Sequence, residues 1–178
     1  MNQHTAENRR EAAPAAHETA PPTSRGWLRA VVAPVPLAFA AGILITGVVG
    51  AFGVPYFGGW QAALTGGLVL LFLMGAVGRL GPQRAGLIAM VPNRFPRPDL
   101  IVAATGILEA AGAIGLLLPP THRLAALCLA ALLVAVFPAN VKAARSSVGL
   151  AGRPATPLVP RAVVQAVYLA ACLAVALA

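Results

Sequence analysis

The sequence predicts an all-α membrane protein with five transmembrane helices. Of its 178 residues, 58% are hydrophobic and only 10% are charged, whereas a soluble domain carries about 25% charged residues. The apolar residues gather in five segments of about 17 to 20 residues, each long enough to cross a bilayer as a helix. Nearly all of the basic residues fall between these segments on one side of the predicted topology.

The N-terminal part divides into a tail and a first span. Residues 1–30 are rich in Ala, Pro, Glu and Thr without apolar periodicity, which predicts a disordered cytoplasmic tail. Residues 31–59 hold the first span, Val35–Val54, and a short loop. The alternative interpretation of the apolar region after Arg29 is a secretory signal. Against it, the apolar run is long, starts late and lacks a clear small-x-small cleavage pattern behind it.

Residues 60–178 hold four further apolar segments, which we expect to be helices because a helix satisfies its own backbone hydrogen bonds in lipid. Within the first connection, Gln83 to Val91 predicts a short interfacial helix with Arg84 toward anionic lipid headgroups, although a site for a substrate phosphate is the alternative. The four expected spans are Gln61 to Val77 or Gly78, Leu100–Leu118, Leu124–Val141 and Ala162–Ala178.

The basic residues predict the orientation. With five spans, twelve of the thirteen basic residues fall on one side and only Arg123 falls on the other. The positive-inside rule then places the N-terminus in the cytoplasm and the C-terminus outside, in a bacterial inner membrane. A model with four spans would divide the basic residues 8 against 5 between the two sides, so the charges favour five spans. The net charge of +8 is thereby explained by topology, and we expect the lipid bilayer rather than nucleic acid as its partner.

One carboxylate, Glu109, stands in the middle of the third span. The residues one helical turn away from it are all small, so this face should pack against another helix while the opposite face meets lipid. They are Thr105, Gly106, Gly112 and Ala113.

A charge without a partner at mid-bilayer costs about 2.5–3.5 kcal/mol on insertion scales. No basic residue is obvious at the depth of Glu109, since Arg79 and Arg97 lie near one membrane boundary and Arg123 near the other. We therefore expect Glu109 to point into the bundle in its protonated form. It is a candidate proton carrier, ligand anchor or quinone contact, and the structural alternative is an interhelical hydrogen bond.

Three further polar residues are candidates for the same ligand or proton site. Asn140 follows Pro138, whose ring releases a backbone carbonyl near Val134, and the Asn140 amide could satisfy that kink. Gln165 in the last span falls at a similar depth, so the two amides could bond each other or a ligand. Tyr168 lies one turn from Gln165 on the same face, and its alternative role is core packing.

The sequence carries no pattern that indicates a metal or a nucleotide. Cys128 and Cys172 lie inside apolar runs without a C-x-x-C motif, so we expect both thiols to be free. There is no His/Cys cluster with metal spacing, no P-loop and no dinucleotide fingerprint. We expect no metal, and no cofactor is evident from the residues themselves.

From about Trp60 to the C-terminus the chain resembles the DoxX-like family of small bacterial membrane proteins. The resemblance implies that residues 60–178 form a four-helix transmembrane bundle, and Val35–Val54 falls outside it as one additional N-terminal span. Some relatives are associated with thiol, thiosulfate or quinone redox chemistry. Gly78 stands where family members commonly have His, which weakens the transfer of any His-dependent activity. The segments that carry the resemblance are FLMGAVGRLGP (Phe72–Pro82), MVPNRFPRPDLIVAATGILEAAGAIGLLLP (Met90–Pro119), HRLAALCLAALLVAVFPANV (His122–Val141) and PRAVVQAV (Pro160–Val167).

Three functions are compatible with these observations. The first is a non-enzymatic membrane component that binds a small hydrophobic molecule or a partner protein. The second is a subunit of a membrane redox system, with a redox partner protein and a quinone as its cofactor. The third is a small transporter or proton pathway centred on Glu109. The sequence favours the first, because it contains no catalytic motif.

Overall fold

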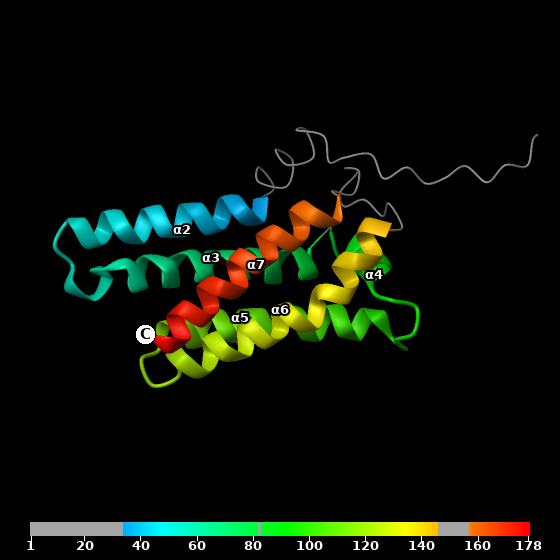
Figure 1. The fold of residues 1–178 in the computed structure, drawn as a ribbon. Helices are drawn as coiled ribbons and strands as arrows, with labels where there is room; N and C mark the ends of the chain where they lie inside the picture. The colour runs from blue at the N-terminus through cyan, green and yellow to red at the C-terminus, as the bar shows by residue number, and fades with distance from the viewer. Residues whose placement is uncertain (1–33, 82, 146–156) are drawn as a thin grey trace, which may run out of the picture.

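The structure is a computed structural model that describes residues 34–81, 83–145 and 157–178 (Figure 1). The expected tail, residues 1–30, lies outside the described residues. Proline and glycine separate the helices, as the Gly81 turn after α3 and Pro119 after α5 illustrate. The elements are α2 (Pro34–Ala51), η2 (Pro55–Phe57), α3 (Trp60–Leu80), α4 (Arg84–Met90), α5 (Pro98–Leu117), α6 (His122–Arg145) and α7 (Leu158–Leu177).

Five of these helices, α2, α3, α5, α6 and α7, are long and apolar enough to cross a membrane. No strand occurs in the described ranges, so the predicted all-α membrane fold is confirmed. Several helices extend beyond the predicted spans. α3 continues to Leu80, α6 runs from His122 to Arg145 through Pro138, and α7 begins at Leu158 rather than Ala162.

The helices α3, α5, α6 and α7 form a four-helix bundle, and α2 packs along the outside of α3 (Figure 1). The buried apolar core comes from these four helices and is built around side chains such as Leu68, Phe72, Leu116, Leu129 and Val175. α2 contributes Phe39, whose ring meets the ring of Tyr168 edge-on with centroids 5.2 Å apart. The outward face of α2 exposes large apolar side chains, which suits lipid: Leu37, Leu44, Ile45 and Val48.

Small residues let α2 approach α3 closely. A Cβ placed on Gly42 would overlap the backbone of Gly66 and Gly67. A Cβ placed on Gly66 would in turn overlap the buried side chain of Thr46. The two backbones can therefore meet only because glycine stands at both contact points, as is common between transmembrane helices.

The connection between α3 and α5 closes one end of the bundle. The short helix α4 confirms the helix expected between Gln83 and Val91, and it packs against α3, α5 and α6. After it, the Lys142 ammonium donates to the carbonyl oxygen of Val91 and, at 2.8 Å, to Oδ1 of Asn93. These bonds attach the connection to the end of α6.

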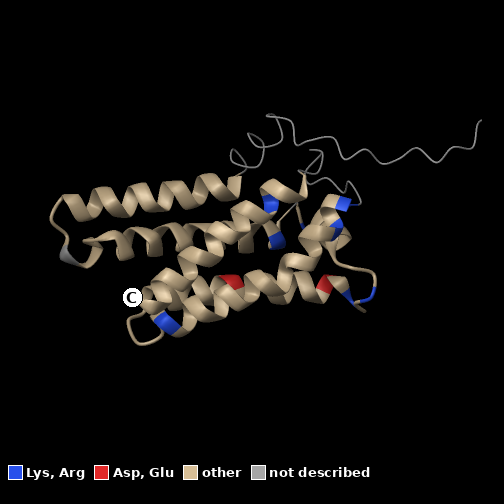
Figure 2. Cartoon of the chain, in the orientation of Figure 1, with Lys and Arg blue, Asp and Glu red and all other residues tan. Residues whose placement is uncertain are grey.

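The described basic residues gather at this end of the bundle, which we call the basic end (Figure 2). Only Arg123, at the start of α6, lies at the opposite end among the described residues. The basic end carries Arg79, Arg84, Arg94, Arg97, Lys142, Arg145 and Arg161.

The two cysteines lie in different environments. Cys172 is fully buried in the core, whereas Cys128 faces outward from α6, and both thiols are free in the structure, as predicted.

This difference predicts selective alkylation. Iodoacetamide should modify Cys128 of the folded protein in detergent and leave Cys172 unmodified, because the core excludes the reagent from Cys172. Peptide mass spectrometry measures the modified fraction of each thiol, and SDS-denatured protein, in which both should react, is the control. Equal modification of both cysteines in the folded protein would contradict this packing.

Candidate functional site

A cavity of about 670 Å³ opens inside the basic end, between α3, α4, α5, α6 and α7. Most of its wall is apolar and includes Phe72, Met90, Phe95, Val136 and Val164. All four residues that the sequence singled out as candidates line this one cavity. The polar and charged side chains of the wall are Arg79, Thr105, Glu109, Asn140, Arg161, Gln165 and Tyr168.

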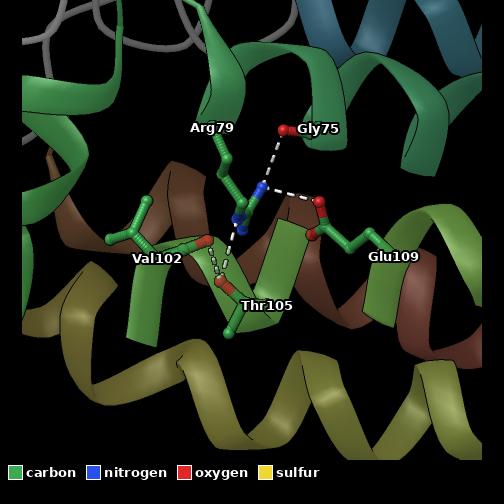
Figure 3. Close-up of polar contacts among 5 residues, drawn as sticks. All are labelled: Gly75, Arg79, Val102, Thr105 and Glu109. Carbon is green, nitrogen blue, oxygen red and sulfur yellow. Dashed lines mark hydrogen bonds and ion pairs between the residues drawn. The ribbon is translucent and has the colours of Figure 1, made fainter. Parts of the chain in front are cut away.

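Glu109 is held in an ion pair on one wall of the cavity. It is buried, with 6% of its surface exposed, and its Oε2 lies 2.7 Å from Nη1 of Arg79 (Figure 3). The same Nη1 donates to the carbonyl oxygen of Gly75 at 3.0 Å, and Nε donates to Oγ1 of Thr105 at 3.1 Å. Thr105 donates in turn to the carbonyl oxygen of Val102. The guanidinium is therefore fixed by three different acceptors.

The prediction that Glu109 has no basic residue at its depth is wrong. The expected span ended at Val77 or Gly78, which would have left Arg79 at the membrane boundary, but α3 continues to Leu80. Side chains on a helix lean toward its N-terminus, so the long Arg79 side chain turns back into the bundle. The expectation that Glu109 is protonated rested on the absence of a nearby cation, and Arg79 supplies one.

The small-residue face of α5 packs against neighbouring helices, as predicted. Gly106 lies against the side-chain carbons of Arg79, and a Cβ on Gly112 would overlap Leu129 of α6. Ala113 is fully buried. The opposite face is exposed, as expected for contact with lipid, and presents Ile107, Leu108, Ile114 and Leu118.

Gly75 on α3 is a site residue that the sequence analysis missed. A Cβ on this glycine would lie 2.6 Å from Oε2 of Glu109 and 3.2 Å from Nη1 of Arg79. The ion pair therefore occupies the space that a larger residue would need. Its signal in the sequence is weak, since Gly75 is one of 18 glycines.

The two amide side chains meet on another wall of the cavity. Nδ2 of Asn140 donates to Oε1 of Gln165 at 2.7 Å, which is the mutual bond that their similar depth suggested. Gln165 then donates from Nε2 to the carbonyl oxygen of Leu133. The amide that reaches the backbone near Pro138 is thus Gln165 and not Asn140, and its acceptor lies one residue before Val134.

Tyr168 combines packing with an unused polar group. Its ring belongs to the core and only 7% of its surface is exposed. Its hydroxyl is buried and has no hydrogen-bond partner in the described part of the chain. Buried tyrosine hydroxyls usually have a partner, and this one belongs to a residue of the cavity wall. The arrangement suits a molecule that enters the cavity and bonds this hydroxyl.

A second cavity, also of about 670 Å³, lies at the opposite end of the bundle. Four of its polar side chains, those of Tyr56, Thr65, His122 and Arg123, already have backbone partners. For example, the hydroxyl of Tyr56 donates to the carbonyl oxygen of Leu117 at 3.0 Å, and Nδ1 of His122 lies 2.6 Å from the carbonyl oxygen of Leu116. The basic-end cavity is the stronger candidate, because it combines the ion pair with the unused hydroxyl.

Comparison with known proteins gives a family but no activity. No curated protein and no solved structure matches the sequence. A family model described as a domain of unknown function (DUF8561) matches residues 67–176. This range runs from α3 to α7 and contains every residue of the basic-end cavity wall except Val35 and Pro36. Because the match covers more than half of the chain, the protein belongs to the DUF8561 family.

Proposed function

We propose that this protein is a non-enzymatic membrane component that binds a small, mostly apolar molecule in the basic-end cavity. The observation that carries the proposal is the buried hydroxyl of Tyr168, a cavity-wall residue, which lacks a partner among the described residues. An apolar wall with a few polar groups that fix orientation is typical of small-molecule sites. The ligand's apolar body would contact side chains such as Phe72 and Val136, and its polar group would bond Tyr168.

The proton-pathway alternative has less support. A Glu109 carboxylate paired with Arg79 at 2.7 Å would have to give up its partner before it took up a proton. A residue that carries protons in a membrane needs a way to exchange its charge.

The redox alternative remains a specific version of the binding proposal. A quinone has an apolar ring and carbonyl acceptors, so it belongs to the class of ligand that this cavity suits, and the resemblance to DoxX-like proteins implies such a partner. A quinone that co-purifies from gently solubilised membranes would favour this version, and mass spectrometry of the extracted small molecules would detect it.

Filling the cavity should abolish binding. Ala139 lines the cavity, so Ala139→Phe places a ring where the ligand would lie and should weaken binding by about tenfold or more. Radiolabelled 1-decanol, with protein in phosphatidylcholine nanodiscs and empty nanodiscs as the blank, measures the saturable component.

Ala131→Phe is the matched control for that experiment. Ala131 lies on the same helix but faces outward and is not part of the cavity wall, so this variant should bind decanol like the wild type. Absence of saturable binding to the wild type would refute the proposed function. Equal loss in both variants would show that a bulky residue on α6 disturbs the fold rather than the site.

The basic end should face the cytoplasm, because cytoplasmic loops carry the excess of Lys and Arg. A phosphatase reporter active only in the periplasm should therefore be active when fused after Ala178 and inactive when fused at Gly149. A cytoplasmic reporter at the same two positions is the control and should show the reverse. Phosphatase activity at Gly149 alone would contradict the proposed orientation in the bacterial inner membrane.

A further inference from the structure

Building on the proposed function, we propose that the basic-end cavity selects ligands whose polar group is uncharged, such as a hydroxyl or a carbonyl. The charged side chains beside the deep part of the cavity already neutralise each other, and the polar group left for a ligand there is a neutral hydroxyl.

The first observation is the closed ion pair. The positive guanidinium of Arg79 and the negative carboxylate of Glu109 balance each other, with Nη1 and Oε2 2.7 Å apart. Hydrogen bonds to Gly75 and Thr105 hold the guanidinium in that geometry. A ligand carboxylate could gain a strong contact with Arg79 only by displacing Glu109. A ligand ammonium would likewise have to displace Arg79. Either exchange leaves one protein charge without its partner in an apolar wall, which is costly.

The second observation is how the neutral polar groups are used. The amides of Asn140 and Gln165 bond each other, and Gln165 also bonds the backbone of Leu133. Tyr168 differs, since its hydroxyl lacks a partner in the described residues although it is buried. A hydroxyl can both donate and accept, so it suits an alcohol or a carbonyl and supplies no counter-charge to an ion.

Arg161 is the remaining charged side chain of the wall, and it lies away from this region. It belongs to the first turn of α7 and already makes an interaction of its own. It precedes Tyr168 by seven residues, which is about 10 Å along a helix. Arg161 therefore lies nearer the end of the bundle than Tyr168 in α7 and Glu109 in the middle of α5, and the ion pair and Tyr168 determine selection deeper in the cavity.

A matched set of probes tests the selection. 1-Decanol, decanoate and decylammonium share one apolar chain and differ in the charge of the polar group. Binding to protein in phosphatidylcholine nanodiscs, corrected for partition into empty nanodiscs, should be at least about tenfold tighter for decanol than for either ion. Binding of decanoate or decylammonium as tight as that of decanol would overturn the inference while leaving the proposed function intact. No saturable binding of any probe would instead refute the proposed function.

Glu109→Gln tests the cause. Glutamine keeps the shape of the side chain but leaves the Arg79 charge unmatched, so the affinity for decanoate relative to decylammonium should rise by about tenfold. Tyr168→Phe is the control variant: it should weaken decanol binding roughly threefold to tenfold through loss of one hydrogen bond and leave the ratio of the two ions unchanged. An unchanged ratio of decanoate to decylammonium in Glu109→Gln would overturn the proposed role of the ion pair.

Discussion

Replacing Arg79 by Met is expected to lower the free energy of unfolding by about 3 kcal/mol. Removal of one partner of a buried ion pair typically costs about 3–5 kcal/mol, and the lower value applies because this pair borders a cavity. The substitution leaves the Glu109 carboxylate without its cation and removes the donors that bond Gly75 and Thr105. Unfolding by SDS in mixed micelles, followed by circular dichroism, measures the change.

A second substitution separates the lost charge from the lost packing. In Arg79→Met with Glu109→Gln, no isolated charge remains, so more than half of the lost stability should return. Arg94→Met is the matched control. Arg94 is exposed in the connection after α4 and its guanidinium lies over the ring of Phe95, so this substitution should change the stability by no more than about 1 kcal/mol. If Arg79→Met and Arg94→Met had the same small effect, the ion pair would not stabilise the bundle.

Replacing Gly42 by Ile is expected to separate α2 from α3 at a cost of about 2 kcal/mol or more. The new side chain would overlap the backbone of Gly66 and Gly67, and a backbone cannot turn aside as a flexible side chain can. The helices must then move apart along their contact, including the place where Thr46 meets Gly66. The same SDS titration measures the loss.

Gly47→Ile on the same helix is the matched control. It adds the same apolar volume and the same helix propensity, but a Cβ on Gly47 meets no atom of the described residues within 4 Å. Its stability should stay within about 0.5 kcal/mol of the wild type. Equal destabilisation by the two substitutions would contradict the close approach of α2 and α3.

The membrane fold could be predicted from the sequence because the bilayer imposes a strong constraint. An apolar segment of this length must satisfy its backbone internally, so composition and proline positions were enough to find the five long helices. The ends of the helices were harder to predict. The expected spans ended at Val77 or Gly78 and at Val141, yet α3 continues to Leu80 and α6 to Arg145.

The candidate site was predictable as a set of residues but not as a network. Glu109, Asn140, Gln165 and Tyr168 stood out because polar groups are costly in lipid, and the structure places them around one cavity. The partner of Glu109 could not be found from depth alone. The reach of Arg79 depends on two extra residues of α3 and on the direction of its side chain, and neither is visible in a hydropathy pattern.

The unused hydroxyl of Tyr168 was also beyond sequence reasoning. Periodicity placed Tyr168 on the face of Gln165, but whether its hydroxyl has a partner depends on how the other helices pack around it, which periodicity does not show. The cavity itself arises from the way α4 and the end of α6 close the bundle, which includes the bonds from Lys142 to Val91 and Asn93.

Photoaffinity labelling would test the central claim most directly. Decanol that carries a diazirine on its chain should, on irradiation in nanodiscs, label the cavity-wall segments 87–95, 133–140 and 161–168. Excess unlabelled decanol should suppress this labelling in the wild type, and Ala139→Phe should lack it. Labelling confined to the lipid-facing side of α2, and unaffected by excess decanol, would contradict a ligand site at the basic end.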